Sequence, residues 1–157
     1  MTQKPGAKID PRTLARRVFE AMEANDRVFH ALGMREIEVG PGHAVLEMTV
    51  REDMLNGHDI CHGGMIFSLA DTAMAVAANS YNQRAVASGA DITFLESARK
   101  GEVLRAETEQ RSLRKRTGLY DITVTGPDSR IIALVRGRIQ RVNAKVVPDL
   151  PGTTDDL

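Results

Sequence analysis

The centre of the chain, residues 65–78, is a run of mainly apolar side chains. Placed on a helix with 3.6 residues per turn, they point in every direction rather than to one side. The apolar positions are Met65, Ile66, Phe67, Leu69, Ala70, Ala73, Met74, Ala75, Val76, Ala77 and Ala78. Such a helix is normally buried on all sides, and this one is too short and too interrupted to span a bilayer. The pattern predicts a central buried helix whose alanines allow a sheet to pack closely against it.

Two other patterns precede this helix. Over residues 11–33 the apolar positions form an amphipathic stripe, which begins after a capping Asp10 and is broken near Asn25. This stripe predicts an N-terminal helical segment packed on the outside of the core. From 34 to 50, apolar and polar residues alternate on both sides of a glycine- and proline-containing turn, which predicts a hairpin of half-buried strands.

After the central helix, four further runs alternate between apolar and polar residues or carry strand-forming residues between turns. They cover residues 85–95, 103–110, 118–124 and 131–142. Two strands, a buried helix and four strands predict one α+β domain over residues 1–157, in which a sheet wraps around the helix. The last residues, 143–157, are polar with two prolines, so we expect a loose tail there.

One charged residue interrupts the central helix. Asp71 is the only charged side chain between Gly64 and Asn79. An isolated carboxylate in an apolar setting is costly unless it is paired or hydrogen-bonded. Either Ser68 or Thr72 satisfies this carboxylate by a local hydrogen bond, or the carboxylate has a catalytic role. In the second case its surroundings tune its basicity. We favour the second interpretation.

The residues around this helix resemble those of a known enzyme family. Asn56, His62-Gly63-Gly64 and Asp71 stand in the stretch LNGHDICHGGMIFSLADTA, followed in order by AVAS, TFL and TGLYDI. This series is similar to the hotdog-fold acyl-CoA thioesterases, and most similar to their phenylacetic-acid-degradation (PaaI-type) branch. The likeness spans roughly residues 14–142. HGG alone would be a weak signal, but an acid eight residues later in an apolar helix makes it fairly specific.

The resemblance implies a fold, a reaction and an assembly. The fold would be the hotdog arrangement, an antiparallel sheet wrapped around a long central helix. The reaction would be hydrolysis of aryl- or arylacetyl-CoA thioesters, of the phenylacetyl-CoA or hydroxyphenylacetyl-CoA type, in phenylacetate degradation. Coenzyme A would be part of the substrate, and no separate cofactor is expected. The family forms homodimers that often pair into homotetramers.

The resemblance also implies catalytic roles for particular residues. The backbone N–H of Gly63 would bind the thioester oxygen, and Asp71 would act as base or nucleophile. Asn56 would support the substrate carbonyl or the loop, and Ser88 would help to place the water. His62 is expected to fix the turn through hydrogen bonds. These roles agree with the chemistry, because the N-terminus of a buried helix offers free N–H groups and the positive end of its dipole.

The spacing of two of these residues has a geometric consequence. Gly63 and Asp71 are eight residues apart, so on one helix they stand about 12 Å apart along the axis. A hydrogen-bond donor and a base acting on one thioester must be much closer. The simplest arrangement is a dimer in which each chain contributes one of the two groups to a shared site.

A basic run is the candidate for the rest of the substrate. It precedes Thr117 and Gly118 and consists of Arg111, Arg114, Lys115 and Arg116. It is either a solvated hairpin tip or a set of contacts to the phosphates of coenzyme A. Gly64, Arg114, Lys115, Arg116, Thr117 and Gly118 are therefore the predicted substrate-binding residues, and Arg138 and Arg141 are lesser candidates.

Composition narrows the remaining possibilities. Lys and Arg balance Asp and Glu at 21 each, which gives no indication of nucleic-acid or membrane binding. A single cysteine, Cys61, fits a reducing compartment, and residues 1–10 show no export signal, so we expect a cytoplasmic protein.

His58, Cys61 and His62 lie close in sequence, but the remaining histidines lack ligand spacing, and we predict no metal site. A Cys61 nucleophile, a hotdog hydratase and a non-catalytic acyl-CoA-binding module remain as alternatives.

Overall fold

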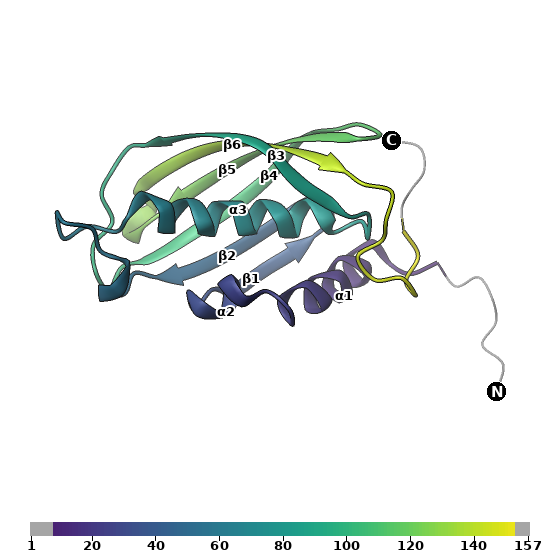
Figure 1. Cartoon of the computed structure of the whole chain (residues 1–157), viewed down its shortest axis with the longest axis horizontal. Helices are drawn as coiled ribbons and strands as arrows, with labels where there is room; N and C mark the ends of the chain where they lie inside the picture. Colours follow the sequence, from purple (N-terminus) through teal and green to yellow (C-terminus); the bar gives the residue numbers. More distant parts are fainter. Residues whose placement is uncertain (1–7, 153–157) are drawn as a thin grey trace.

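The computed structural model describes residues 8–152. Its helices and strands follow one another in the order that the hydrophobic pattern predicts (Figure 1). The helices are α1 (Pro11–Glu23), α2 (Arg27–Ala31) and α3 (Gly63–Asn79), with short 3₁₀ turns at Glu52–Met54 and Pro127–Ser129. The strands are β1 (Arg35–Gly40), β2 (His43–Thr49), β3 (Ala85–Phe94), β4 (Val103–Leu113), β5 (Thr117–Thr125) and β6 (Ile131–Arg141).

The strands form one antiparallel sheet in the order β1-β2-β4-β5-β6-β3. The sheet curves around α3, which contacts every strand in it, while α1 lies outside against β1 and α3 (Figure 1). The prediction of an α+β fold with a sheet around a central helix is confirmed. Although β3 follows α3 directly in the chain, it crosses to the edge of the sheet and, among the described strands, pairs with β6 alone.

Side-chain caps explain the two N-terminal helices. The carboxylate of Asp10 accepts a hydrogen bond from the N–H of Thr13 at 2.9 Å, which starts α1. Asp26 does the same for α2, accepting from the N–H of Phe29 at 2.9 Å. The segment over residues 11–33 is therefore two helices, with the break where Asn25 lies.

The sheet approaches α3 closely. A Cβ atom added to Gly137 of β6 would overlap the sulfur of Met74, so only glycine fits at this point of the sheet. The facing positions of α3 are small or apolar and fully buried, among them Leu69, Ala70 and Ala73. This packing forms the hydrophobic core between helix and sheet.

The prediction that α3 is buried on all sides is wrong. Gly64 is exposed, and Ser68, Asp71, Thr72 and Ala75 are only half-buried. Their spacing places them along one face of the helix. The sheet and α1 cover the other faces, whereas the described part of the chain covers this one only in part. We refer to these five residues as the open stripe of α3.

The segment after β6 also differs from the expected loose tail. Asn82 is completely buried, and its amide group donates to the backbone oxygens of Val147, Leu150 and Pro151 at 2.9–3.2 Å. Its Oδ1 accepts from the N–H of Val147 at 2.8 Å. The buried side chain of Asn82 therefore ties residues 147–151 to the turn after α3, and the N–H of Arg84 also donates to the oxygen of Ala144 at 2.8 Å. Composition alone does not reveal these contacts. The rest of the predicted tail, residues 153–157, lies outside the described residues.

Candidate active site

The loop before α3 is held by hydrogen bonds at both ends. The side-chain oxygen of Asn56 accepts from the N–H of His58 at 2.9 Å, and its backbone N–H donates to the oxygen of Ile60 at 2.9 Å. The N–H of Cys61 donates to Ala98, and that of His62 to Met54, both at 2.8 Å. Asn56 therefore shapes the loop that leads into the helix.

Two neighbouring glycine N–H groups at the start of α3 have different environments. The ring Nδ1 of His62, the N-cap residue, accepts from the N–H of Gly64 at 3.1 Å. The N–H of Gly63 has no acceptor within residues 8–152. His62 already takes the N–H of Gly64 within the chain, and a contact between Gly64 and the substrate stays a prediction. Gly63 alone offers a free donor, supported by the positive end of the helix dipole.

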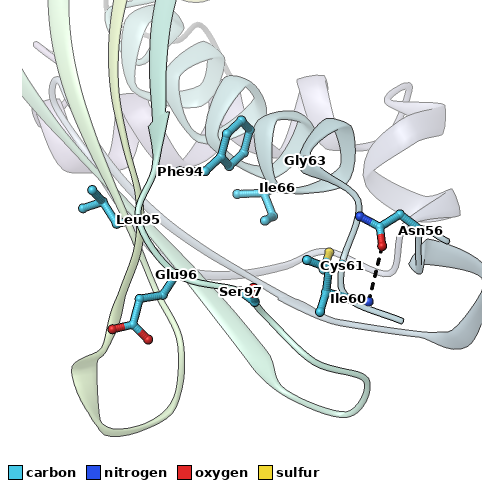
Figure 2. A pocket seen from close by; sticks show the side chains of 9 residues that line it. All are labelled: Asn56, Ile60, Cys61, Gly63, Ile66, Phe94, Leu95, Glu96 and Ser97. Carbon is cyan, nitrogen blue, oxygen red and sulfur yellow. Dashed lines mark hydrogen bonds between the residues drawn. The ribbon is translucent and has the colours of Figure 1, made fainter. Parts of the chain in front are cut away.

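Gly63 lies in a cavity of about 300 Å³ between the start of α3 and the end of β3 (Figure 2). Its walls are Asn56, Ile60, Cys61, Gly63, Ile66, Phe94, Leu95, Glu96 and Ser97. Figure 2 shows the ring of Phe94 beside the start of the helix, and a Cβ atom on Gly63 would lie 2.9 Å from the Cζ of Phe94. A side chain at position 63 would therefore displace this ring.

Asp71 stands on the open stripe of α3. Partial burial raises the pKa of its carboxyl above the ordinary value for aspartic acid. The hydroxyls of Ser68 and Thr72 donate to the backbone oxygens of Gly64 and Ser68, each at 2.8 Å, rather than to Asp71. No hydrogen bond or ion pair joins Asp71 to another residue in the described chain. The alternative in which Ser68 or Thr72 satisfies this carboxylate is therefore wrong.

The other predicted site residues lie elsewhere in the monomer. Ser88 forms a bulge in β3, between Ala87 and Gly89. With Thr117 and Gly118 it lines a second cavity of about 270 Å³. The walls of that cavity are completed by Ser112, Leu119, Arg138 and Ile139. Asp71 lines neither this cavity nor that of Gly63. One chain alone does not bring the predicted catalytic residues together.

The basic run lies at the hairpin between β4 and β5. Lys115 and Arg116 line a third cavity, of about 530 Å³, which also includes Arg141. Arg114 lines none of these three cavities, and its N–H donates to the backbone oxygen of Thr117 at 2.7 Å within the turn. The structure thus divides the predicted run: Arg114 belongs to the turn, Lys115 and Arg116 line a cavity, and Arg111 pairs with Glu109 and Asp121 at 3.1 and 3.5 Å.

Several residues of the Gly63 cavity have no role in the sequence prediction. Phe94, Glu96 and Ser97 reach the cavity because β3 ends beside the start of α3. The TFL motif that contains Phe94 is visible in the sequence, but its function is not. Strand order was the missing information, since the position of β3 at the sheet edge depends on long-range pairing.

The alternatives based on Cys61 and on metals find no support. Burial raises the pKa of the Cys61 thiol to about 11, which opposes formation of a nucleophilic thiolate. Within residues 8–152, no three His, Cys, Asp or Glu side chains converge in a way that could hold a metal ion. In the same range, no helix has both the length and the apolar character needed to cross a membrane.

Comparison with known proteins now places the chain in a family. A family model described as the thioesterase superfamily matches residues 58–133. Over 126 residues the chain is 44% identical to the acyl-coenzyme A thioesterase PaaI of Escherichia coli, covering 80% of this chain and 90% of that protein. The chain belongs to the thioesterase superfamily.

Solved structures of PaaI proteins share its fold. The E. coli PaaI protein of the phenylacetic acid degradation operon matches with a TM-score of 0.85 and 42% identity, covering 87% of this chain and 99% of that one. A variant of the phenylacetic acid degradation protein PaaI from Thermus thermophilus matches with a TM-score of 0.72 and 32% identity, covering 74% and 100%. The predictions of a PaaI-type resemblance, a hotdog fold and a thioesterase enzyme are confirmed.

Proposed function

We propose that this thioesterase hydrolyses arylacetyl-CoA or aryl-CoA thioesters to the free acid and coenzyme A, as part of phenylacetate degradation in the cytoplasm. The similarity to PaaI proteins over nearly their full length supports the substrate class. The observation that carries the proposal is a pair of unsatisfied groups on one helix. Gly63 offers an N–H without an acceptor, and Asp71 is a half-buried carboxylate without a partner in the described chain.

The two groups suit the two needs of thioester hydrolysis. As water or a carboxylate attacks the carbonyl carbon, negative charge develops on the carbonyl oxygen. The N–H of Gly63, at the positive end of α3, stabilises that charge. Asp71 either removes a proton from the attacking water or attacks the carbonyl itself. Desolvation raises its pKa, which makes it a stronger base than an exposed aspartate.

The site requires a second copy of the chain. Gly63 and Asp71 are eight residues apart on α3, about 12 Å along the axis, and share no cavity. The open stripe of α3 and the unpaired edge of β3 are the surfaces we assign to the dimer. Val86 of that strand and Leu95, just after its end, are about half exposed. Each site would then combine Gly63 and Asn56 of one copy with Asp71 of the other.

We further infer that two dimers pair into a homotetramer. Leu134 of β6 and Val103 of β4 are exposed apolar side chains that alternate with buried neighbours, so they lie on the outer face of the sheet. Exposed apolar residues on a sheet face favour association with another apolar surface. Light scattering of the purified protein would separate dimer from tetramer.

Incubation of the purified protein with phenylacetyl-CoA and a thiol-reactive reagent tests the reaction. Release of one free thiol per ester consumed is the expected result. Tight binding without turnover would instead indicate an acyl-CoA-binding module. A hydratase needs an α,β-unsaturated acyl-CoA, so hydration of a 2-enoyl-CoA without thiol release would indicate that alternative. Asp71→Asn serves as the control, since it keeps the shape of the side chain and removes the base.

A further inference from the structure

The cavity at the start of α3 combines one polar group with apolar walls. Gly63 contributes the N–H without an acceptor, while Ile60, Ile66, Phe94 and Leu95 contribute carbon surface. A cavity of about 150 Å³ in a protein core is enough to bind benzene. The volume of about 300 Å³ therefore accommodates an aromatic ring with a short chain. This cavity suits an apolar acyl group next to the group that binds the thioester oxygen.

Phe94 is more exposed than the other aromatic residues of the described chain. Its surface is 50% exposed, whereas Phe19 and Phe29 are each 6% exposed and Tyr120 is fully buried. Phe19 and Phe29 also pack edge to face, with ring centres 6.0 Å apart. Within residues 8–152, the ring of Phe94 has no aromatic or cationic partner. Because this ring lines the Gly63 cavity, it offers an unoccupied aromatic surface there.

The ring of Phe94 meets the start of α3 with its far end. A Cβ atom added to Gly63 would lie 2.9, 3.2 and 3.4 Å from the Cζ, Cε1 and Cε2 atoms of this ring. These atoms form the tip of the ring, so its faces do not pack against Gly63 (Figure 2). The strand fixes this position, because Phe94 is the last residue of β3 and pairs with Ala133 of β6. The ring is therefore held in contact with the residue that offers the free N–H.

We propose that Phe94 is a specificity-determining residue, which recognises an aromatic acyl group through contact between the two rings. This role rests on the proposed function, in which the N–H of Gly63 binds the thioester oxygen. In an arylacetyl group one methylene separates the ring from the carbonyl carbon, so a carbonyl bound at Gly63 places the ring beside Phe94. Aromatic pairs gain about two- to tenfold in affinity beyond the effect of area burial. The aliphatic walls of the cavity do not make this distinction between an aromatic and a saturated ring.

Two substrates of similar size separate ring recognition from apolar burial. They are phenylacetyl-CoA and cyclohexylacetyl-CoA, each measured with the wild-type protein and with Phe94→Leu, which keeps an apolar side chain and removes the aromatic ring. We expect the ratio of kcat/KM for the phenyl ester to that for the cyclohexyl ester to fall about two- to tenfold in Phe94→Leu. Most of the change should appear in KM, because the ring contact is the same in the bound substrate and in the transition state.

Two further variants make the comparison specific. Ile60→Ala is the matched control, because Ile60 lines the same cavity, is half-buried and is aliphatic. It should lower kcat/KM for both esters by a similar factor and leave their ratio unchanged. Phe94→Met places a flexible apolar side chain in the space of the ring, and it should lower the ratio as Phe94→Leu does.

Binding measurements separate failure of this role from failure of the proposed function. Calorimetric titration with the thioethers 2-phenylethyl-CoA and 2-cyclohexylethyl-CoA compares the two rings without turnover. We expect the wild type to prefer the phenyl thioether and the preference to shrink about two- to tenfold in Phe94→Leu. If the wild type leaves phenylacetyl-CoA intact, the proposed function is wrong, and the thioethers still test Phe94.

The partner copy is the other candidate for covering Phe94. Light scattering of both Phe94 variants examines this alternative. Retention of the wild-type oligomer together with a lowered phenyl preference supports recognition of the substrate. Equal preferences in the wild type and both variants, or dissociation of the oligomer in both variants, would overturn the proposal and assign Phe94 to the protein interface.

Discussion

The C-terminal end of α3 and the rest of the helix differ in whether hydrogen bonds within the fold satisfy their polar groups. At the C-terminal end, the buried side chain of Asn79 bonds to the oxygen of Ala75 and to both backbone groups of Ala85, at 2.9–3.1 Å. Ser80 accepts from the N–H of Gly42 and donates to the oxygen of Ala77. At the N-terminal end the N–H of Gly63, and in the middle of the helix the carboxylate of Asp71, have no partner in the described chain.

This difference separates structural from functional polar groups. A buried polar group that the fold itself satisfies stabilises the native state, whereas one left unsatisfied costs stability and is retained for another reason. Side chains at the C-terminal end of α3, which we call its closed end, should therefore affect the stability of the fold and leave the catalytic rate unchanged. Removal of the unsatisfied groups of Gly63 and Asp71 should lower the catalytic rate and cost little stability.

The largest expected effect is that of Asp71→Asn on turnover. We expect kcat to fall by roughly 10²- to 10⁴-fold while the fold and CoA binding persist, because the amide keeps the shape and loses the basic oxygen. Steady-state kinetics and circular dichroism measure the two properties. In the wild type, kcat/KM should decline on acidification at a higher pH than an ordinary aspartate would cause, since the pKa of Asp71 is raised. Near-normal turnover in the variant would remove Asp71 from the mechanism.

The N–H of Gly63 can be tested with a matched pair of variants. His62 is the N-cap, so position 63 is the first of the helix, where proline fits, and the extended backbone of His62 is compatible with a following proline. Gly63→Ala and Gly63→Pro both press a Cβ atom against Phe94, but only proline also removes the N–H. We expect kcat for Gly63→Pro to be roughly 10²- to 10³-fold below that for Gly63→Ala. Equal rates would show that this donor does not bind the thioester oxygen.

Mixing the two damaged chains tests the shared site. Gly63→Pro and Asp71→Asn should each be nearly inactive as homodimers. After joint unfolding and refolding, half of the dimers are mixed, and each mixed dimer has one intact site if the two groups come from different chains. About a quarter of the wild-type activity should return by symmetry. Absence of recovery in dimers that are demonstrably mixed, for example by a mass tag, would contradict the two-chain site.

The same contrast explains what could be predicted from the sequence. The helices and strands can be predicted because apolar and polar residues alternate over short stretches of the chain. Gly63 and Asp71 stand out because an HGG turn opens an apolar helix that contains a single acid. Those signals are local. The position of Phe94 beside Gly63 depends on β3 crossing to the sheet edge, and the closure of residues 147–151 depends on Asn82, 65 residues before Val147. Neither leaves a periodic pattern, so both required the folded chain.

The closed end of α3 should respond in stability rather than in rate. Asn79→Ala leaves the N–H of the buried Ala85 without its side-chain acceptor, which should lower the free energy of unfolding by about 1–3 kcal/mol. Asn25→Ala is the matched control, because its single hydrogen bond to Ala21 is exposed and should contribute less than about 0.5 kcal/mol. Urea titration measures both. A loss of kcat per folded molecule in Asn79→Ala would contradict a purely structural role.

The smallest expected effect is a gain in stability when Asp71 is replaced by asparagine. Because burial raises the pKa of Asp71 in the folded state, the native protein binds this proton more tightly than the unfolded chain does. Its contribution to stability is therefore fully present below the unfolded pKa and is lost as the pH rises through the raised folded pKa. At neutral pH the charged form is a net cost, which Asp71→Asn removes. We expect Tm to rise by no more than about 3 °C at pH 7, and the gain to shrink as the pH falls toward the unfolded pKa. Melting curves across that range check the sign, and a variant less stable than the wild type at pH 7 would show that Asp71 has a stabilising partner in the assembled protein.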